Sequence, residues 1–157
     1  MRTLLILWIV WSLGTCHSAV PEAPNDFDWT TWSNAAVGYA LEIPDVYRAQ
    51  VDDGGHTVLF RWSGTVPVKV YFTDLESARV RGLRADEEPS CETSLAGLPA
   101  VRYDYTHCDG PFCSGIISWA AERDGRWLAL EFRSEGELSS VNRRILDSFT
   151  ILPAGAD

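Results

Sequence analysis

Apolar and polar residues alternate along several stretches of the chain, and this period of two predicts β-strands. In residues 37–43, valine, tyrosine, leucine and isoleucine occupy every second position. Four further stretches show the same alternation, at residues 58–62, 66–72, 101–105 and 128–132. Several of these stretches are joined by short connections, which are typical of hairpins. The pattern therefore predicts a largely antiparallel β-sheet.

Turns rich in glycine and aspartate separate the predicted strands. Residues 63–65 (Ser-Gly-Thr) lie between the second and third stretches, and Asp124 with Gly125 precedes the last one. Residues 52–55 (Asp-Asp-Gly-Gly) form a further turn signal. Glycine and aspartate accept a positive φ at little cost, as tight hairpin turns require. The segments 58–62 and 66–72 are therefore expected to form a hairpin.

Two helices are expected at capping-box sequences, in which a hydroxyl and a carboxylate satisfy backbone amides at a helix start. Ser134 and Glu137 fit this pattern, and apolar residues then recur at helical spacing, which predicts an amphipathic helix over 136–147. Thr73 and Glu76 repeat the pattern after a strand and predict a second, weaker helix. We find no internal repeat, and the pattern predicts one domain.

The composition is that of a globular protein and excludes one class of function. The 157 residues are 46% hydrophobic, 11% aromatic and 22% charged, with a formal net charge of −9. A chain of this length buries enough surface to form a core without a metal or a disulfide framework. General nucleic-acid binding depends on neutralising phosphates, which an acidic chain does poorly. We therefore expect no nucleic-acid partner.

The N-terminus is typical of an exported protein. Arg2 gives a positive start, and residues 4–13 (LLILWIVWSL) form an apolar run in which Ser12 is the one polar residue. Crossing a bilayer takes about twenty such residues, so this run fits a signal peptide better than a membrane span. We predict a signal peptide at 1–19, a Pro-rich tether at 20–31, and a single domain at 32–153.

Cys16 is a candidate for lipid attachment. Residues 13–16 (Leu-Gly-Thr-Cys) resemble the lipobox of bacterial lipoproteins, although Thr15 stands where that pattern prefers Gly, Ala or Ser. Cleavage near Ser18 or Ala19 would instead discard Cys16 with the signal peptide. The first alternative places the protein on a membrane through a lipid anchor, and the second places it free in the periplasm.

Four short motifs carry a family resemblance: residues 38–44 (GYALEIP), 95–102 (LAGLPAVR), 127–132 (WLALEF) and 145–149 (ILDSF). In these motifs the chain resembles the PsbP-like family, which includes the extrinsic photosystem II subunit PsbP and the envelope lipoprotein DcrB. The resemblance covers about residues 32–152. It implies an α+β fold, in which an antiparallel β-sheet is flanked by helices in an α/β/α sandwich. It implies no shared chemistry, because members either bind protein partners or have no known role.

The cysteines of the domain predict a disulfide. Cys108 and Cys113 flank four turn residues between expected paired strands, which brings them close to disulfide spacing. Pairing of Cys91 with either of them is a rival, and a zinc site that includes His107 is a weaker one. Otherwise Cys91 is left over, as a buried thiol or, less in keeping with the spacing, as a nucleophile beside His56 or His107.

Neither the acidic clusters nor a search for catalytic motifs indicates a metal site or an active site. Residues 52–53, and residues 86–88 with Glu92, could collect a divalent cation, but solvated turn charge explains both better. The chain contains none of the Gly-x-Ser-x-Gly, phosphate-loop or His-Glu-x-x-His motifs. We therefore expect no catalytic, metal or cofactor residues. Trp29 and Trp32 flank the tether and could dock the N-terminus or a partner.

These observations favour a non-enzymatic envelope protein, exported and either periplasmic or lipid-anchored, that serves an unidentified envelope partner as a binding or accessory module. The alternative is a small-ligand or divalent-cation binding protein, or less readily a hydrolase-like enzyme with a pocket between sheet and helix. Arg102, Asp104 and His107 around one deep pocket would be the signature of that alternative.

Overall fold

The computed structural model describes residues 26–74, 89–134 and 136–153. The predicted signal peptide and Cys16 lie outside the described residues. So do the first part of the predicted tether, most of the helix predicted after residue 73, and the acidic cluster at 86–88.

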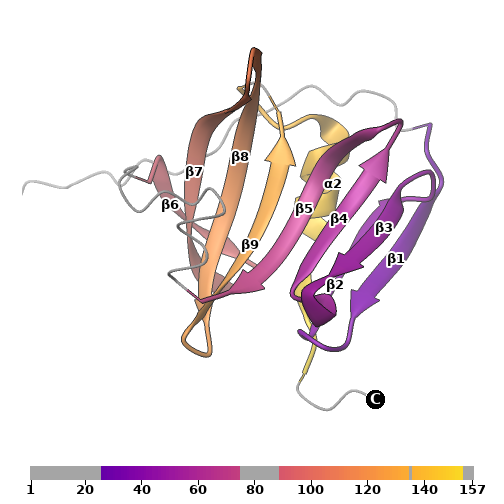
Figure 1. The fold of residues 1–157 in the computed structure, drawn as a ribbon. Coiled ribbons are helices and arrows are strands. Elements are labelled where there is room, and N and C mark those ends of the chain that lie inside the picture. Colours follow the sequence, from indigo (N-terminus) through magenta and orange to yellow (C-terminus); the bar gives the residue numbers. More distant parts are fainter. Residues whose placement is uncertain (1–25, 75–88, 135, 154–157) are drawn as a thin grey trace, which may run out of the picture.

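Two antiparallel sheets make up most of the fold (Figure 1). The strands of the larger, seven-stranded sheet are, in spatial order, β3 (Arg48–Asp52), β4 (Thr57–Trp62), β5 (Thr65–Thr73), β9 (Arg126–Arg133), β8 (Phe112–Arg123), β7 (Leu98–Asp109) and β6 (Cys91–Leu95). A 3-10 turn, η1 (Asp53–Gly55), links β3 to β4. The smaller sheet has the order β1 (Trp29–Asn34), β2 (Tyr39–Pro44) and β10 (Thr150–Ile151). The predicted antiparallel sheet is thereby confirmed.

The larger sheet is assembled from two hairpin-built halves. Strands β3, β4 and β5 follow one another along the chain and pair in that order, and β6 to β9 do the same. The two halves meet where β5 pairs with β9, with Val70 opposite Leu130. This seam joins segments that are far apart in the sequence, and it carries the residues of the candidate site described below.

The predicted hairpin turns are confirmed. Ser63 and Gly64 between β4 and β5 have φ of 48° and 78°, and Asp124 and Gly125 between β8 and β9 have φ of 55° and 72°. Two consecutive residues with positive φ match the right-handed twist of the flanking strands. The short Ser-Gly and Asp-Gly sequences therefore set the register of both hairpins.

The helix α2 (Ser140–Ser148) begins later than the capping box predicts. Its N-cap is Ser139, whose hydroxyl accepts a hydrogen bond of 3.1 Å from the backbone amide of Asn142. Ser134 instead donates to the carbonyl oxygen of Glu137 and closes a turn ahead of the helix. Leu138 is buried between that turn and the helix, so the apolar pattern begins before the helical backbone does.

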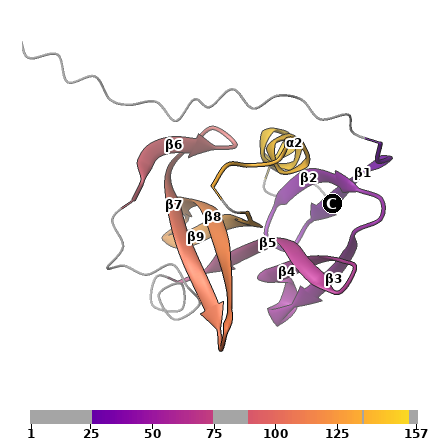
Figure 2. The same ribbon diagram turned by 90° about the horizontal axis from the view of Figure 1, so that it is seen from above.

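The expected α/β/α sandwich is not found. Within the described residues there is one α-helix, and it lies beside β2 on the concave side of the large sheet (Figure 2). The second layer is therefore made of α2 together with the small sheet. Apolar residues of the small sheet, such as Tyr39 and Leu41, cover part of the large sheet, where a helix was expected.

The hydrophobic core fills the space between these two layers. From the large sheet it takes alternate residues, among them Val58, Phe60, Val68, Val70, Trp119, Leu128, Leu130 and Phe132. The other layer contributes Tyr39, Leu41, Ile43, Ile145 and Phe149. We call this side of the large sheet the inner face and the opposite side the outer face. The alternation predicted for 128–132 is confirmed on the inner face.

Candidate functional site

The outer face also buries side chains where β5, β9 and β8 lie together. Tyr71, Ala129 and Ala120 are fully buried there and form a second small apolar cluster. Glu131 follows on the same face and is only 6% exposed. Strand alternation places Glu131 on the polar side of β9, so its burial is a property of the assembled sheet that the sequence pattern does not indicate.

Every oxygen of the Glu131 carboxylate has a partner. Oε1 accepts hydrogen bonds from the hydroxyl of Tyr71 at 2.9 Å and from that of Tyr105 at 2.6 Å. Oε2 lies 3.2 Å from Nζ of Lys69. A buried carboxylate is tolerated when it is both paired and hydrogen-bonded, as it is here. The three partners come from β5 and β7, so this cluster depends on pairing across the seam.

Tyr71 acts as a neutral donor in this cluster. Its burial raises the pKa of the phenol far above the ordinary value of 10, and the nearby charge of Glu131 and the hydroxyl of Tyr105 raise it further. The ammonium group of Lys69 lies over its ring, 4.7 Å from the centroid. Lys69 is thus held by both the carboxylate and the aromatic face.

A pocket of about 390 Å³ opens beside this cluster. Its lining combines cationic, anionic, polar and apolar side chains: Val66, Lys69, Tyr105, His107, Phe112, Ser114, Ile116, Glu131 and Arg133. Nη2 of Arg133 donates a hydrogen bond to the hydroxyl of Ser114, which ties the guanidinium to the neighbouring strand. This volume lies within the range of sites that take a small ligand or a peptide side chain.

The hairpin of β7 and β8 extends beyond the rest of the sheet (Figure 1). Residues of both strands line the pocket. Strand β6 pairs with β7 up to Arg102, and β9 pairs with β8 from Ile116 onward. Past these points β7 and β8 form a ladder only with each other within the described residues, apart from one backbone hydrogen bond from Ser134 to Gly115. At the tip, Phe112 is 76% exposed, although an aromatic side chain of this size is usually at least half-buried.

The predicted disulfide between Cys108 and Cys113 is present and lies directly across this hairpin. The two residues are register partners with a Cα separation of 4.0 Å. Neither sulfur is therefore available as a thiolate, so the zinc alternative that used them with His107 is wrong. Cys91 is not a free thiol either, which removes both the buried-thiol interpretation and the nucleophile alternative.

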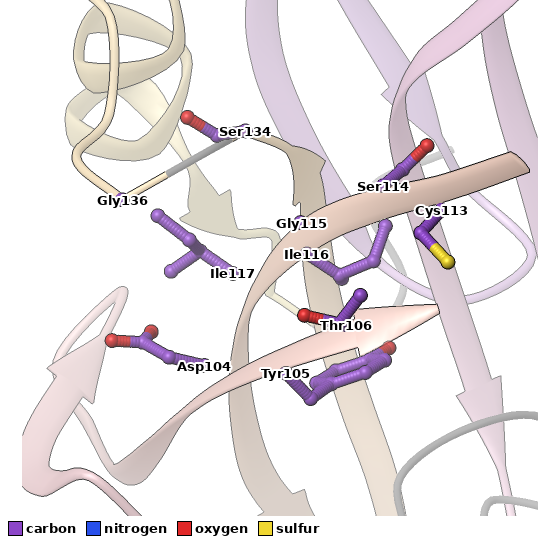
Figure 3. Close-up of a pocket in the computed structure, with 10 residues that line it drawn as sticks. All are labelled: Asp104, Tyr105, Thr106, Cys113, Ser114, Gly115, Ile116, Ile117, Ser134 and Gly136. Carbon is purple, nitrogen blue, oxygen red and sulfur yellow. The ribbon is translucent and has the colours of Figure 1, made fainter. Parts of the chain in front are cut away.

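A second pocket, of about 410 Å³, lies at the base of the same hairpin (Figure 3). Asp104, Thr106 and Ile117 line it from the strands, and Ser134 and Gly136 line it from the segment before α2. Asp104 is already paired, because its carboxylate accepts from Nε of Arg102 at 2.8 Å. The Ser134 hydroxyl donates to a backbone carbonyl and has no base beside it among the described residues. This pocket offers no arrangement for nucleophilic catalysis.

Arg102, Asp104 and His107 do not form the common pocket that the enzyme or small-ligand alternative requires. Arg102 and Asp104 are next-nearest neighbours on β7 and share one face, whereas His107 projects from the other. Asp104 lines the pocket at the hairpin base and His107 lines the outer one. The three side chains therefore do not surround a common cavity.

The acidic turn at residues 52–53 is engaged in local hydrogen bonds. Both carboxylate oxygens of Asp52 accept from the amide of Gln50 at 3.2 Å, and Asp53 Oδ2 accepts from Thr57 Oγ1 at 3.4 Å. No group of three or more metal-ligating side chains occurs in the described part of the chain. Glu92 is described, but residues 86–88, with which it was grouped, are not.

The two N-terminal tryptophans pack onto the body of the fold. Trp32 meets the ring of Phe60 edge-on at 5.2 Å, and the guanidinium of Arg144 lies 4.1 Å from the ring centroid of Trp29. Both tryptophans lie in β1, which starts inside the segment expected to be a tether. Their aromatic faces thus contact the protein itself.

Comparison with solved structures identifies similar folds. A crystal structure from Bacteroides thetaiotaomicron VPI-5482 aligns with a TM-score of 0.54 and 10% identity, covering 80% of this chain and 49% of that one. This chain therefore spans about half the length of the Bacteroides protein. The solution structure of cyanobacterial PsbP (CyanoP) from Synechocystis sp. PCC 6803 aligns with a TM-score of 0.52 and 10% identity, covering 85% of this chain and 98% of that one.

The fold is PsbP-like. No protein-family model matches the sequence, and no curated protein does. The resemblance inferred from the sequence motifs is therefore confirmed at the level of the PsbP-like fold. Among the helices of the described residues, none is long and apolar enough to cross a membrane.

Proposed function

We propose that the protein is an exported, non-enzymatic module of the cell envelope that binds another protein and supports it. The N-terminal sequence pattern favours export, and a disulfide is typical of an oxidising compartment outside the cytoplasm. The PsbP-like fold agrees with an accessory role. Lipid attachment through Cys16 and release into the periplasm remain the two alternatives for its placement.

The projecting hairpin carries this proposal. Phe112 presents a large aromatic surface to solvent, and the disulfide beneath it holds the two strands together. Exposed aromatic residues next to cationic ones are typical of the centre of protein interfaces. An exposed aromatic side chain of this size lowers the solubility of the free protein. Burial of the side chain against a partner removes that disadvantage.

Site-specific photo-crosslinking tests this function. A photoreactive phenylalanine analogue at position 112 should give one discrete adduct in intact cells. The same analogue at Val51 is the matched control, because Val51 is 53% exposed but lies on the far edge strand β3. A discrete adduct at 112 with none at 51 supports a binding module. Equal labelling at both positions, or none at 112, contradicts it.

A further inference from the structure

We propose that the outer pocket beside the projecting hairpin recognises an acidic residue within an apolar segment of the partner, with Arg133 as the anchoring cation. The inference rests on the proposed function and deepens it, because it names the chemistry that the partner presents. It concerns the 390 Å³ pocket lined by Lys69, His107 and Arg133.

The charges around this pocket do not cancel. Glu131 is the acidic residue of the lining, and it already pairs with Lys69 at 3.2 Å while accepting from two tyrosines. Arg133 has no carboxylate partner among the described residues, and its one hydrogen bond goes to the neutral hydroxyl of Ser114. The pocket therefore presents an uncompensated guanidinium on a chain whose net charge is −9.

The guanidinium of Arg133 is tied to the hairpin at one nitrogen, and its other N–H groups can donate to a carboxylate. Arg133 lies opposite Ile116 in the register of β8 and β9, and its bond to Ser114 holds the side chain along the hairpin. A guanidinium that uses one N–H locally keeps others for a second acceptor, and arginine matches carboxylate geometry with paired hydrogen bonds. His107 lines the same pocket and can donate a further hydrogen bond.

The apolar part of the lining specifies the neighbours of the acidic residue. Val66, Ile116 and Phe112 line the same pocket, and Phe112 is largely exposed at its rim. A free inorganic anion would leave this surface in water. A peptide that places apolar side chains on either side of a carboxylate would cover it, which favours a protein segment as the occupant.

The test uses two acetylated, amidated tripeptides that differ at one position, Val-Glu-Phe and Val-Gln-Phe. Binding to the full mature protein is followed by NMR chemical-shift titration. The Glu peptide should bind about tenfold more tightly than the Gln peptide, and Arg133→Gln should remove that preference, because a charge-assisted hydrogen bond is lost. Arg133→Lys keeps the charge and should retain part of the preference.

Arg61→Gln is the matched control, since Arg61 is an exposed arginine of the same sheet outside the pocket and its loss changes net charge equally. Its peptide affinities should match those of the wild type. Equal affinity for the two peptides, no binding of either at millimolar concentration, or an equal effect of Arg61→Gln would overturn the inference. A discrete crosslink at position 112 would still stand in those cases, so failure of this inference and failure of the binding function can be told apart.

Discussion

The two faces of the large sheet bury side chains by different means. On the inner face of β9, Leu130 and Phe132 are completely buried among apolar neighbours. On the outer face of the same strand, Glu131 is nearly as buried, but it is held by two tyrosine hydroxyls and an ammonium group. One face thus excludes water by packing, and the other satisfies a charge within the protein.

This difference separates stability from recognition. Apolar packing stabilises the fold in proportion to the apolar area removed from water, and it does not depend on the geometry of hydrogen-bond donors. The outer cluster contributes less net stability, because desolvation of the charges opposes their attraction. It fixes Lys69 against Glu131, while Arg133, two residues further along the strand, has no acidic partner among the residues that the structure describes. The following predictions test this division.

The largest effect is expected on the inner face. Phe132→Ala removes a fully buried ring that meets Trp119 at 5.8 Å and should lower the free energy of unfolding by about 3–5 kcal/mol. Phe112→Ala removes a phenyl ring from an exposed position and should change the free energy of unfolding by less than about 0.5 kcal/mol. Urea unfolding followed by circular dichroism measures both. Similar losses for the two variants would contradict the assignment of the faces.

A smaller effect is expected for the outer charge. Glu131→Gln leaves Lys69 without its carboxylate and should cost about 1–3 kcal/mol in urea unfolding. Adding Lys69→Met should recover part of this loss, because the unpaired charge is then gone. Glu42→Gln is the control, since Glu42 pairs with Arg144 at 3.0 Å on the surface and should cost less than about 1 kcal/mol. If the double variant is less stable than Glu131→Gln, the cluster stabilises the fold more than we infer.

The smallest effect appears only at alkaline pH. Because the pKa of Tyr71 is raised in the folded protein, the unfolded chain loses its proton first, above pH 10, and folding stability falls as pH rises further. Tyr71→Phe should reduce the slope of unfolding free energy against pH by up to about 1.4 kcal/mol per pH unit above pH 10. Urea unfolding between pH 8 and 11 measures this, and identical slopes for wild type and variant would exclude a buried neutral phenol. Below pH 9 the two slopes should coincide.

Local features of the fold were predictable from the sequence, and distant ones were not. The Ser-Gly and Asp-Gly turns and the alternation of 128–132 locate strands because they act over a few residues. The disulfide of Cys108 with Cys113 was found for the same reason. Strand β3 was missed, because it is a short edge strand with mostly exposed side chains, and its apolar alternation is limited to Ala49 and Val51. The predicted start of α2 was too early, because Ser134 and Ser139 both offer a hydroxyl that can cap a helix. We infer that the burial of Leu138 favours Ser139 as the N-cap.

The candidate site was not predictable for a different reason. Tyr71 and Glu131 are 60 residues apart, and only the pairing of β5 with β9 brings them together. Within its own strand Glu131 looks like an ordinary solvent-facing residue. Its nearest sequence signal is the pair of tyrosines at 103 and 105 on the face predicted to be apolar, since a tyrosine hydroxyl buried on such a face needs an acceptor.

The position of β9 has a consequence for how the chain folds. It is the last strand of the large sheet along the sequence, yet it inserts between β5 and β8. Until it does so, those two strands each present an open edge that can pair with another chain. Closing the seam requires a long loop, so this step is expected to limit the folding rate. A chain that ends before residue 126 is therefore expected to aggregate through these open edges. Strand β9, although it comes late in the sequence, is the element that protects β5 and β8 from pairing with another chain.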